Sequence, residues 1–109
     1  NIRVRSVIGR FLEHSRVFYF KASDAEALYL SSADWMNRNM MRRVEVAWPV
    51  DDPALRQRII EECLVVYLND QRDAWTMQAD GSYVLVPKIG RKTRGAQQVL
   101  VQRYMKQGA

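Results

Sequence analysis

The chain has 109 residues, 48% of them hydrophobic, so it can build one small packed core but not a second independent domain. Its 17 lysines and arginines against 12 acidic residues give a net charge of +5, which favours an anionic partner such as nucleic acid, a phosphate polymer or an acidic membrane surface. No apolar run approaches the roughly 20 residues that a membrane-spanning helix needs, and the first ten residues do not form a signal peptide.

The first third of the chain predicts a helix followed by a hairpin. A short helix is expected over about residues 3–13 from apolar residues at helical spacing, which are Val4, Ile8, Phe11 and Leu12. It would end just before His14, the only histidine. Residues 17–20 are aromatic or β-branched, KASDAE is polar, and ALYLSS is again largely apolar, so two strands joined by a turn are expected.

The middle of the chain predicts a loop, a strand and the clearest helix. DWMNRNMM has no regular period and predicts a loop, whereas RRVEVAWPV alternates and predicts a strand that Pro49 stops. Residues 50–70 predict a helix with Asp51 or Asp52 as its cap and Pro53 in its first position.

The last third predicts a second hairpin, a basic loop and a closing helix. Asp80-Gly81 is a strong turn signal between two strand-like runs within residues 74–86. Residues 87–95 predict a basic, turn-rich loop. It could bind phosphate or a membrane surface, but a solvated loop or a domain-docking segment is the simpler expectation. Residues 96–106 predict an amphipathic helix. We therefore expect a single α/β or α+β domain over residues 1–109, with a mixed β-sheet covered by helices.

The only cysteine and the beginning of the chain bear on its setting. Cys63 cannot form an internal disulfide, lies on the apolar face of a predicted helix and fits a reducing, cytoplasmic environment. The chain begins at Asn1 rather than methionine, from which we expect a piece of a longer protein.

One group of polar residues has the composition of a phosphoryl-transfer site. Such a site needs a nitrogen base near neutral pH, permanent positive charge and neutral hydrogen-bond donors for phosphate oxygens. Side chains of these three kinds occur within 26 residues of one another, namely His14, Arg16, Ser31, Ser32 and Asn39. By composition alone, His14 could equally be a histidine that is merely hydrogen-bonded at the start of a strand.

A basic stretch follows directly. Arg38, Arg42 and Arg43 could line a channel for an anionic polymer, or the last two could simply pair with Glu45. No metal site is expected within the chain, because Asp51 and Asp52 have a capping role and the paired glutamates lie within a helix.

Longer strings carry a family resemblance. NIRVRSVIGRFLEHSRVFYF, YLSSADWMNRN, RRVEVAWPV, DAWTMQADGSY and VPKIGRKTRGAQQ together resemble the last domain of the bacterial polyphosphate kinases of the first type, from Ile2 to about Tyr104. The shorter H-x-R and S-S-A-D-W strings are similar to the phospholipase D pattern H-x-K-x4-D with a downstream G-S-x-N. Here Arg16 replaces the lysine, Lys21 stands where the aspartate is expected and Ser31 replaces the glycine, which argues against phosphodiesterase activity.

The resemblance implies a phospholipase D-like half and a role in an ATP:polyphosphate phosphotransferase, which reversibly moves the terminal phosphate of ATP to polyphosphate. It implies that His14 is the second active-site histidine, while the phosphorylated one belongs to the preceding catalytic domain of the same chain. Arg16 would face phosphate or pair with Glu13 or Asp34. The implied phosphate-binding residues are Arg16, Ser31, Ser32, Arg38, Asn39 and Arg42.

The resemblance also implies properties of the parent enzyme. Its cofactor would be Mg²⁺, bound mainly outside this fragment, and its substrates would be ATP or ADP and polyphosphate. The parent enzyme would be a cytoplasmic homo-oligomer, which could be peripheral to the inner membrane. The isolated fragment is expected to be inactive. Two alternatives remain open: a phospholipase D-like phosphodiesterase half-site that pairs two copies, and a basic nucleic-acid-binding module.

Overall fold

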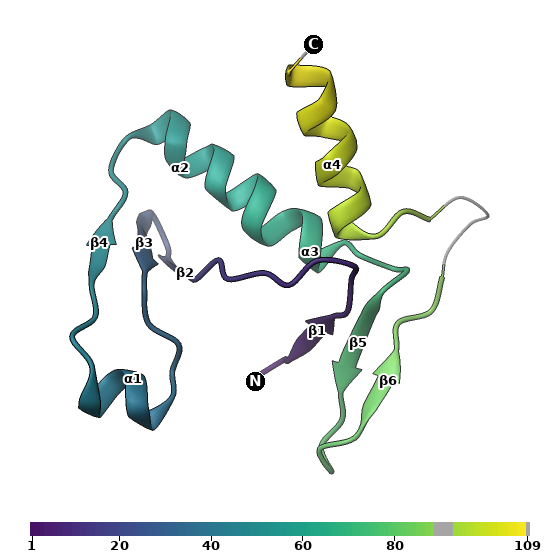
Figure 1. Ribbon diagram of the computed structural model, residues 1–109, viewed down its shortest axis with the longest axis horizontal. Coiled ribbons are helices and arrows are strands. Elements are labelled where there is room, and N and C mark those ends of the chain that lie inside the picture. The colour runs from purple at the N-terminus through teal and green to yellow at the C-terminus, as the bar shows by residue number, and fades with distance from the viewer. Residues whose placement is uncertain (89–92, 109) are drawn as a thin grey trace. The chain divides into compact units, whose positions relative to one another are not determined.

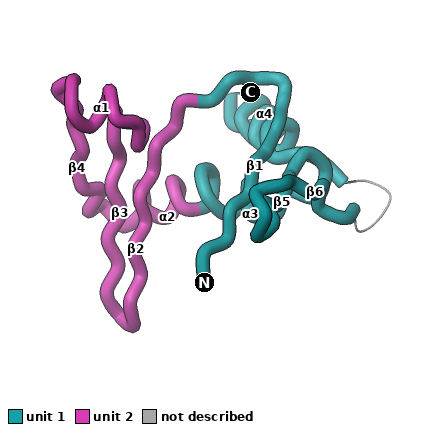
Figure 2. Tube along the Cα trace, turned by 90° about the horizontal axis from the view of Figure 1, so that it is seen from below, with its two compact units in different colours: residues 1–13, 61–109 teal, residues 14–60 magenta. Residues whose placement is uncertain are grey.

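The computed structural model describes residues 1–88 and 93–108, which form two compact units (Figure 2). Unit 1 comprises Asn1–Glu13 and Glu61–Ala109, and unit 2 comprises His14–Ile60. Each unit has a three-stranded sheet of its own. The expectation of a single domain over residues 1–109 stays a prediction.

The sheet of unit 2 is built on a hairpin (Figure 1). β2 (Val17–Ala22) pairs antiparallel with β3 (Ala25–Ser31), with Val17 opposite Leu30. Ser23 lies in the turn with a φ of 50°, the left-handed conformation that tight hairpin turns use. The predicted first hairpin is therefore confirmed.

The third strand of this sheet is shorter than expected. Of the stretch 42–50 that predicted a strand, only β4 (Ala47–Pro49) pairs with β3, where Trp48 lies opposite Leu30. Pro49 is its last residue, as predicted, and the backbone N–H of Val50 makes one further hydrogen bond to the carbonyl of Leu28 at 2.8 Å. β4 is thus a short edge strand in the order β2-β3-β4.

Residues 34–41 include a helical turn, so the predicted loop there is wrong. α1 (Asn37–Arg42) begins with the backbone N–H groups of Asn39 and Met40 donating to the carbonyl of Met36 at 3.0 and 2.9 Å. Asn39 is only 4% exposed and anchors this turn within the unit. An element of six residues is too short to show a helical period, although methionine and arginine are good helix formers.

The predicted long helix is confirmed, with a π-helical stretch in its middle. α2 (Pro53–Ile59), η1 (Ile60–Val65) and α3 (Val66–Leu68) follow one another along the chain. Of the two expected caps, Asp52 takes the role. Its Oδ1 accepts hydrogen bonds from the first free backbone N–H groups of α2 at 2.9 and 3.0 Å.

The sheet of unit 1 has the order β1-β5-β6. β5 (Ala74–Met77) and β6 (Tyr83–Leu85) form the predicted second hairpin (Figure 1). Gly81 lies in its turn with a φ of 89°, a conformation that glycine adopts without a steric cost. The local turn signal therefore identified this hairpin correctly.

The predicted helix over residues 3–13 is wrong. The segment contains β1 (Arg5–Val7), which pairs antiparallel with β5, and the backbone N–H of Ile8 continues the ladder to the carbonyl of Asp73 at 3.0 Å. The error has a simple cause: a spacing of four residues, as between Val4 and Ile8, returns to the same face in a helix and in a strand.

α4 (Ala96–Gln107) confirms the predicted closing helix and carries the core of unit 1. Ala96 and Leu100 pack with Val66 of α3 in a buried cluster. Asp70, which is 1% exposed, accepts backbone hydrogen bonds from Arg72, Asp73 and Ala96 at 2.8, 2.7 and 2.7 Å. This carboxylate thus joins the turn before β5 to the first residue of α4.

The fold is α+β, one of the two classes that the sequence predicted. All strand pairs are antiparallel and lie in two sheets, so the expected single mixed sheet is corrected. Within the predicted basic loop, residues 89–92 lie outside the described residues. No helix among the described residues is long and apolar enough to cross a membrane.

The bonds of Asp70 predict a large cost for its removal. Asp70→Ala should lower the free energy of unfolding by about 3 kcal/mol, because it leaves buried backbone N–H groups without an acceptor. Urea unfolding followed by circular dichroism measures this. Asp80→Ala, in an exposed turn of the same unit, is the matched control and should cost less than about 1 kcal/mol. Equal costs for the two variants would contradict the role assigned to Asp70.

Candidate functional site

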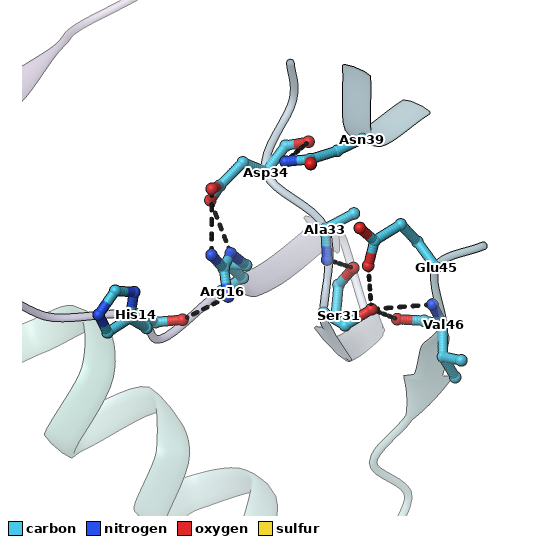
Figure 3. A network of polar contacts seen from close by, with 9 residues as sticks. His14, Arg16, Ser31, Ala33, Asp34, Asn39, Glu45 and Val46 are labelled. Carbon is cyan, nitrogen blue, oxygen red and sulfur yellow. Dashed lines mark hydrogen bonds and ion pairs between the residues drawn. The ribbon is translucent and has the colours of Figure 1, made fainter. Parts of the chain in front are cut away.

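His14 lies in the loop that leads into β2 (Figure 3). The residue is exposed. Residues 8–16 form neither helix nor strand, so no helix delivers the chain to it as the sequence predicted. Its backbone carbonyl accepts a hydrogen bond from Nη1 of Arg16 at 3.0 Å. The position of the imidazole therefore depends on the contacts that hold this loop.

Arg16 and Asp34 form a bidentate ion pair (Figure 3). Nε of Arg16 lies 2.6 Å from Oδ1 of Asp34, and Nη2 lies 3.0 Å from Oδ2. The hydrogen bonds from Arg16 lower the pKa of Asp34 against the opposing effect of desolvation, and the charges of Arg16, His14 and Arg38 lower it further. Of the partners that the sequence left open for Arg16, the structure shows Asp34.

The two serines at the end of β3 are both engaged with the protein. Ser31 Oγ accepts a hydrogen bond from the backbone N–H of Ala33 at 3.1 Å, which closes a tight turn after the strand. Ser32 Oγ donates to the carboxylate of Glu45 and accepts from the backbone N–H of Val46 at 3.0 Å. Within residues 1–88 and 93–108, the hydroxyl hydrogen of Ser31 has no hydrogen-bond acceptor, whereas that of Ser32 is donated to Glu45.

Asn39 is buried beside this turn. Its Nδ2 donates to the backbone carbonyl of Asp34 at 3.5 Å, while its Oδ1 has no hydrogen-bond partner among the described residues. Asn39 also lines a pocket of about 310 Å³, together with Ser31, Arg43 and Glu45. The side chain thus supports the backbone of Asp34 and borders a small polar pocket.

α1 carries the remaining predicted residues. Arg38 and Arg42 are exposed, and Arg43 follows directly after the helix. Arg38 lies close enough to Asp34 for its charge to act on that carboxylate. Glu45, which the sequence offered as a partner for Arg42 or Arg43, instead accepts a hydrogen bond from Ser32.

All seven predicted site residues belong to unit 2, and the hydrogen bonds connect several of them. The chain of contacts runs from His14 to Arg16, on to Asp34, and from there to Asn39. The sequence did not include Asp34 in the site, although it named it as a possible partner of Arg16. The register of the β2–β3 hairpin is the signal that could have identified Asp34. This register places Arg16 beside the end of β3, where the backbone N–H of Ser31 donates to the Arg16 carbonyl at 3.1 Å, and Asp34 follows shortly after.

The carboxylates around this site are already occupied. Asp34 is bound by Arg16, and Glu45 accepts from Ser32. Across residues 1–88 and 93–108, no group of three or more His, Cys, Asp or Glu side chains could together hold a metal ion. Mg²⁺ is bound by oxygen ligands, chiefly carboxylates. Because the carboxylates of Asp34 and Glu45 already bind Arg16 and Ser32, these residues do not by themselves fit a magnesium site.

Comparison with known proteins relates this arrangement to one family. The family model "Polyphosphate kinase C-terminal domain 2" matches residues 1–97. Over 104 residues the chain is 52% identical to a polyphosphate kinase of Burkholderia multivorans and 50% identical to that of Paraburkholderia phytofirmans. Each alignment covers 95% of this chain but only 15% of the relative, so the chain spans about a seventh of the length of these curated relatives.

A solved structure agrees with these sequence relatives. The crystal structure of polyphosphate kinase from Porphyromonas gingivalis is similar with a TM-score of 0.85 and 37% sequence identity. The match covers 99% of this chain and 16% of that chain.

The lowered pKa of Asp34 predicts how pH acts on the Arg16 pair. Above about pH 4, the ordinary value for an unfolded aspartate, the ionised pair stabilises the native state, and this contribution is lost as pH falls through the lower folded pKa. Asp34→Asn should therefore lower the thermal midpoint slightly at neutral pH, and the difference from wild type should vanish in strong acid.

Thermal unfolding of both proteins across the acid range measures this difference. Asp24→Asn, in the exposed turn between β2 and β3, is the control and should match wild type throughout. A deficit in Asp34→Asn that persisted unchanged in strong acid would show that the ion pair is not its cause.

Proposed function

Since the chain belongs to the polyphosphate kinase family, we propose that it is part of an ATP:polyphosphate phosphotransferase, which reversibly transfers the terminal phosphate of ATP to polyphosphate. The observation that carries this proposal is the family match over residues 1–97, which includes the whole network around His14. The activity is that of a longer protein, and this chain contributes one part of its site.

His14 is the second active-site histidine in this proposal. When ATP is used, the bond between its terminal phosphorus and the bridging oxygen breaks, and the phosphoryl group passes to a histidine of the preceding domain. Histidine exchanges protons readily near neutral pH, so protonated His14 can donate to the departing ADP oxygen. In the reverse direction the neutral imidazole accepts that proton. The exposed position of His14 supports access to a nucleotide.

The arginines of the network supply fixed positive charge. Arg38 and Arg42 are exposed and suit the phosphates of ATP or polyphosphate, since a guanidinium stays charged and binds phosphate oxygens in pairs. Arg16 uses its Nε hydrogen and one hydrogen on each terminal nitrogen for Asp34 and His14. One hydrogen on each terminal nitrogen remains for a phosphate.

Neutral donors complete the predicted phosphate-binding set. Ser31 can donate its free hydroxyl hydrogen, because its oxygen only accepts from Ala33. Asn39 borders the adjacent pocket and keeps one amide hydrogen beyond its bond to Asp34. Ser32 would donate to a phosphate oxygen by turning its hydroxyl hydrogen away from Glu45, to which it donates in the structure.

The remaining parts of the proposal concern the parent enzyme. Mg²⁺ would be held mainly by residues outside this chain, because the carboxylates here are occupied, and when bound it would neutralise phosphate charge. The partners are ATP, polyphosphate, the preceding catalytic domain and further copies of the enzyme. We place the parent enzyme in the cytoplasm, associated with the inner membrane.

Replacing His14 in the full-length kinase tests its role in transfer. His14→Ala should lower kcat by roughly 10²- to 10⁴-fold, the usual contribution of a general acid or base. ATP-dependent polyphosphate synthesis measures this, and the isolated chain should show no synthesis. Arg72→Ala, an exposed change in unit 1, is the control. Wild-type turnover in His14→Ala would remove His14 from the mechanism.

Replacing Arg38 and Arg42 tests the binding of the polymer. The double variant in the full-length kinase should bind polyphosphate more weakly, and the slope of log affinity against log salt should fall by about one to two, because fewer counterions are released. Affinity measured at several salt concentrations gives the slope. The same affinity and slope as in Arg72→Ala would exclude these two arginines as polyphosphate ligands.

A further inference from the structure

We propose that Asp34 is a positioning residue for His14, which it holds in place through the guanidinium of Arg16. The inference rests on the proposed function, since it assigns Asp34 a part in the same phosphoryl transfer. Asp34 touches no reacting atom in this assignment. Its effect passes through two hydrogen-bonded steps to the backbone of His14.

The first step is the orientation of the guanidinium. Asp34 binds Nε and Nη2 of Arg16 with its two oxygens, at 2.6 and 3.0 Å, so it defines both the plane and the direction of a rigid group. The remaining terminal nitrogen, Nη1, then points to the carbonyl of His14 at 3.0 Å. Among the contacts of the described residues, Asp34 is the only side chain hydrogen-bonded to this guanidinium, so its removal leaves Nη1 without the anchor that directs it to this carbonyl.

Asp34 can orient the guanidinium because it is itself anchored. Its backbone carbonyl accepts from the buried Asn39, and its neighbour Ala33 is 7% exposed and donates to Ser31 Oγ. On the other side, the ring of Trp35 lies 5.8 Å from that of Phe18 on β2, measured between centroids. The carboxylate is therefore presented by a segment attached to the sheet on both sides, as positioning groups require.

Arg16 holds the loop of His14 on its C-terminal side, whereas Phe11 and Glu13, before the histidine, are bound by Gln97. Residues 8–16 form neither helix nor strand, and the exposed imidazole has no hydrogen bond or ion pair of its own among those described for unit 2. A displacement of about 1 Å in a reacting group can cost 10²-fold in rate. The pair also stays ionised at neutral pH, because Arg16 lowers the pKa of Asp34.

The test uses the full-length kinase. Asp34→Asn keeps the size of the side chain but loses its charge and one acceptor oxygen, so kcat should fall roughly 10- to 100-fold while KM for ATP changes little. Asp34→Glu, which restores the carboxylate, should recover part of kcat. Asp24→Asn, an exposed carboxylate of the same unit, should leave both constants unchanged.

Arg16→Lys provides the second variant in case Asp34→Asn fails to fold. Lysine keeps the positive charge but lacks the planar fork that binds Asp34 and His14 at once, so the same loss of kcat is expected. Wild-type kcat in either folded variant, alongside an inactive His14→Ala, would overturn the positioning role and leave the proposed function intact. Full activity in His14→Ala would overturn the proposed function itself, and the positioning role with it.

Discussion

The buried carboxylate of Asp70 is the interaction on which the assembly of unit 1 depends. It accepts backbone hydrogen bonds from the turn before β5 and from Ala96, the first residue of α4, while its own carbonyl accepts from Arg5 of β1. The chain passes close by at this point: a Cβ on Gly95 would lie 2.2 Å from a side-chain oxygen of Asp73, so a larger residue there would require the Asp73 side chain to move. The side chain of Asp70 thereby joins the turn before β5 to α4, and its backbone carbonyl adds a bond to β1. The core of α3 and α4 includes Ala96, which donates to this carboxylate.

Asp34 acts in unit 2 by the same chemistry but in a different environment. Both Asp70 and Asp34 use a carboxylate to gather donors from separate segments, yet the side chain of Asp34 is 46% exposed. A partly exposed ion pair contributes little to stability because water competes for both charges. Its consequence is therefore geometric, since it directs the guanidinium of Arg16 toward the loop of His14.

Local signals in the sequence were reliable where one short segment determines the structure. The cap at Asp52 and the turn at Gly81 each depend on residues within a few positions of one another. The signals failed where a distant partner decides. The segment around Arg5 is a strand because β5 lies beside it. α1 contains the buried Asn39, and no periodic pattern in the sequence predicts this helix.

The sequence by itself determined the hairpins, the capped helix and the family, because these follow from neighbouring residues or from long matching strings. Only the tertiary structure decided which acid pairs with Arg16, that Ser32 donates a hydrogen bond to Glu45, and that Arg16 binds the backbone of His14. Arg16 and Asp34 are 18 positions apart, and Ser32 and Glu45 are 13 positions apart. Asp34 reaches the loop of His14 only through Arg16. They depend on strand register and packing, which bring distant donors and acceptors to within hydrogen-bonding distance.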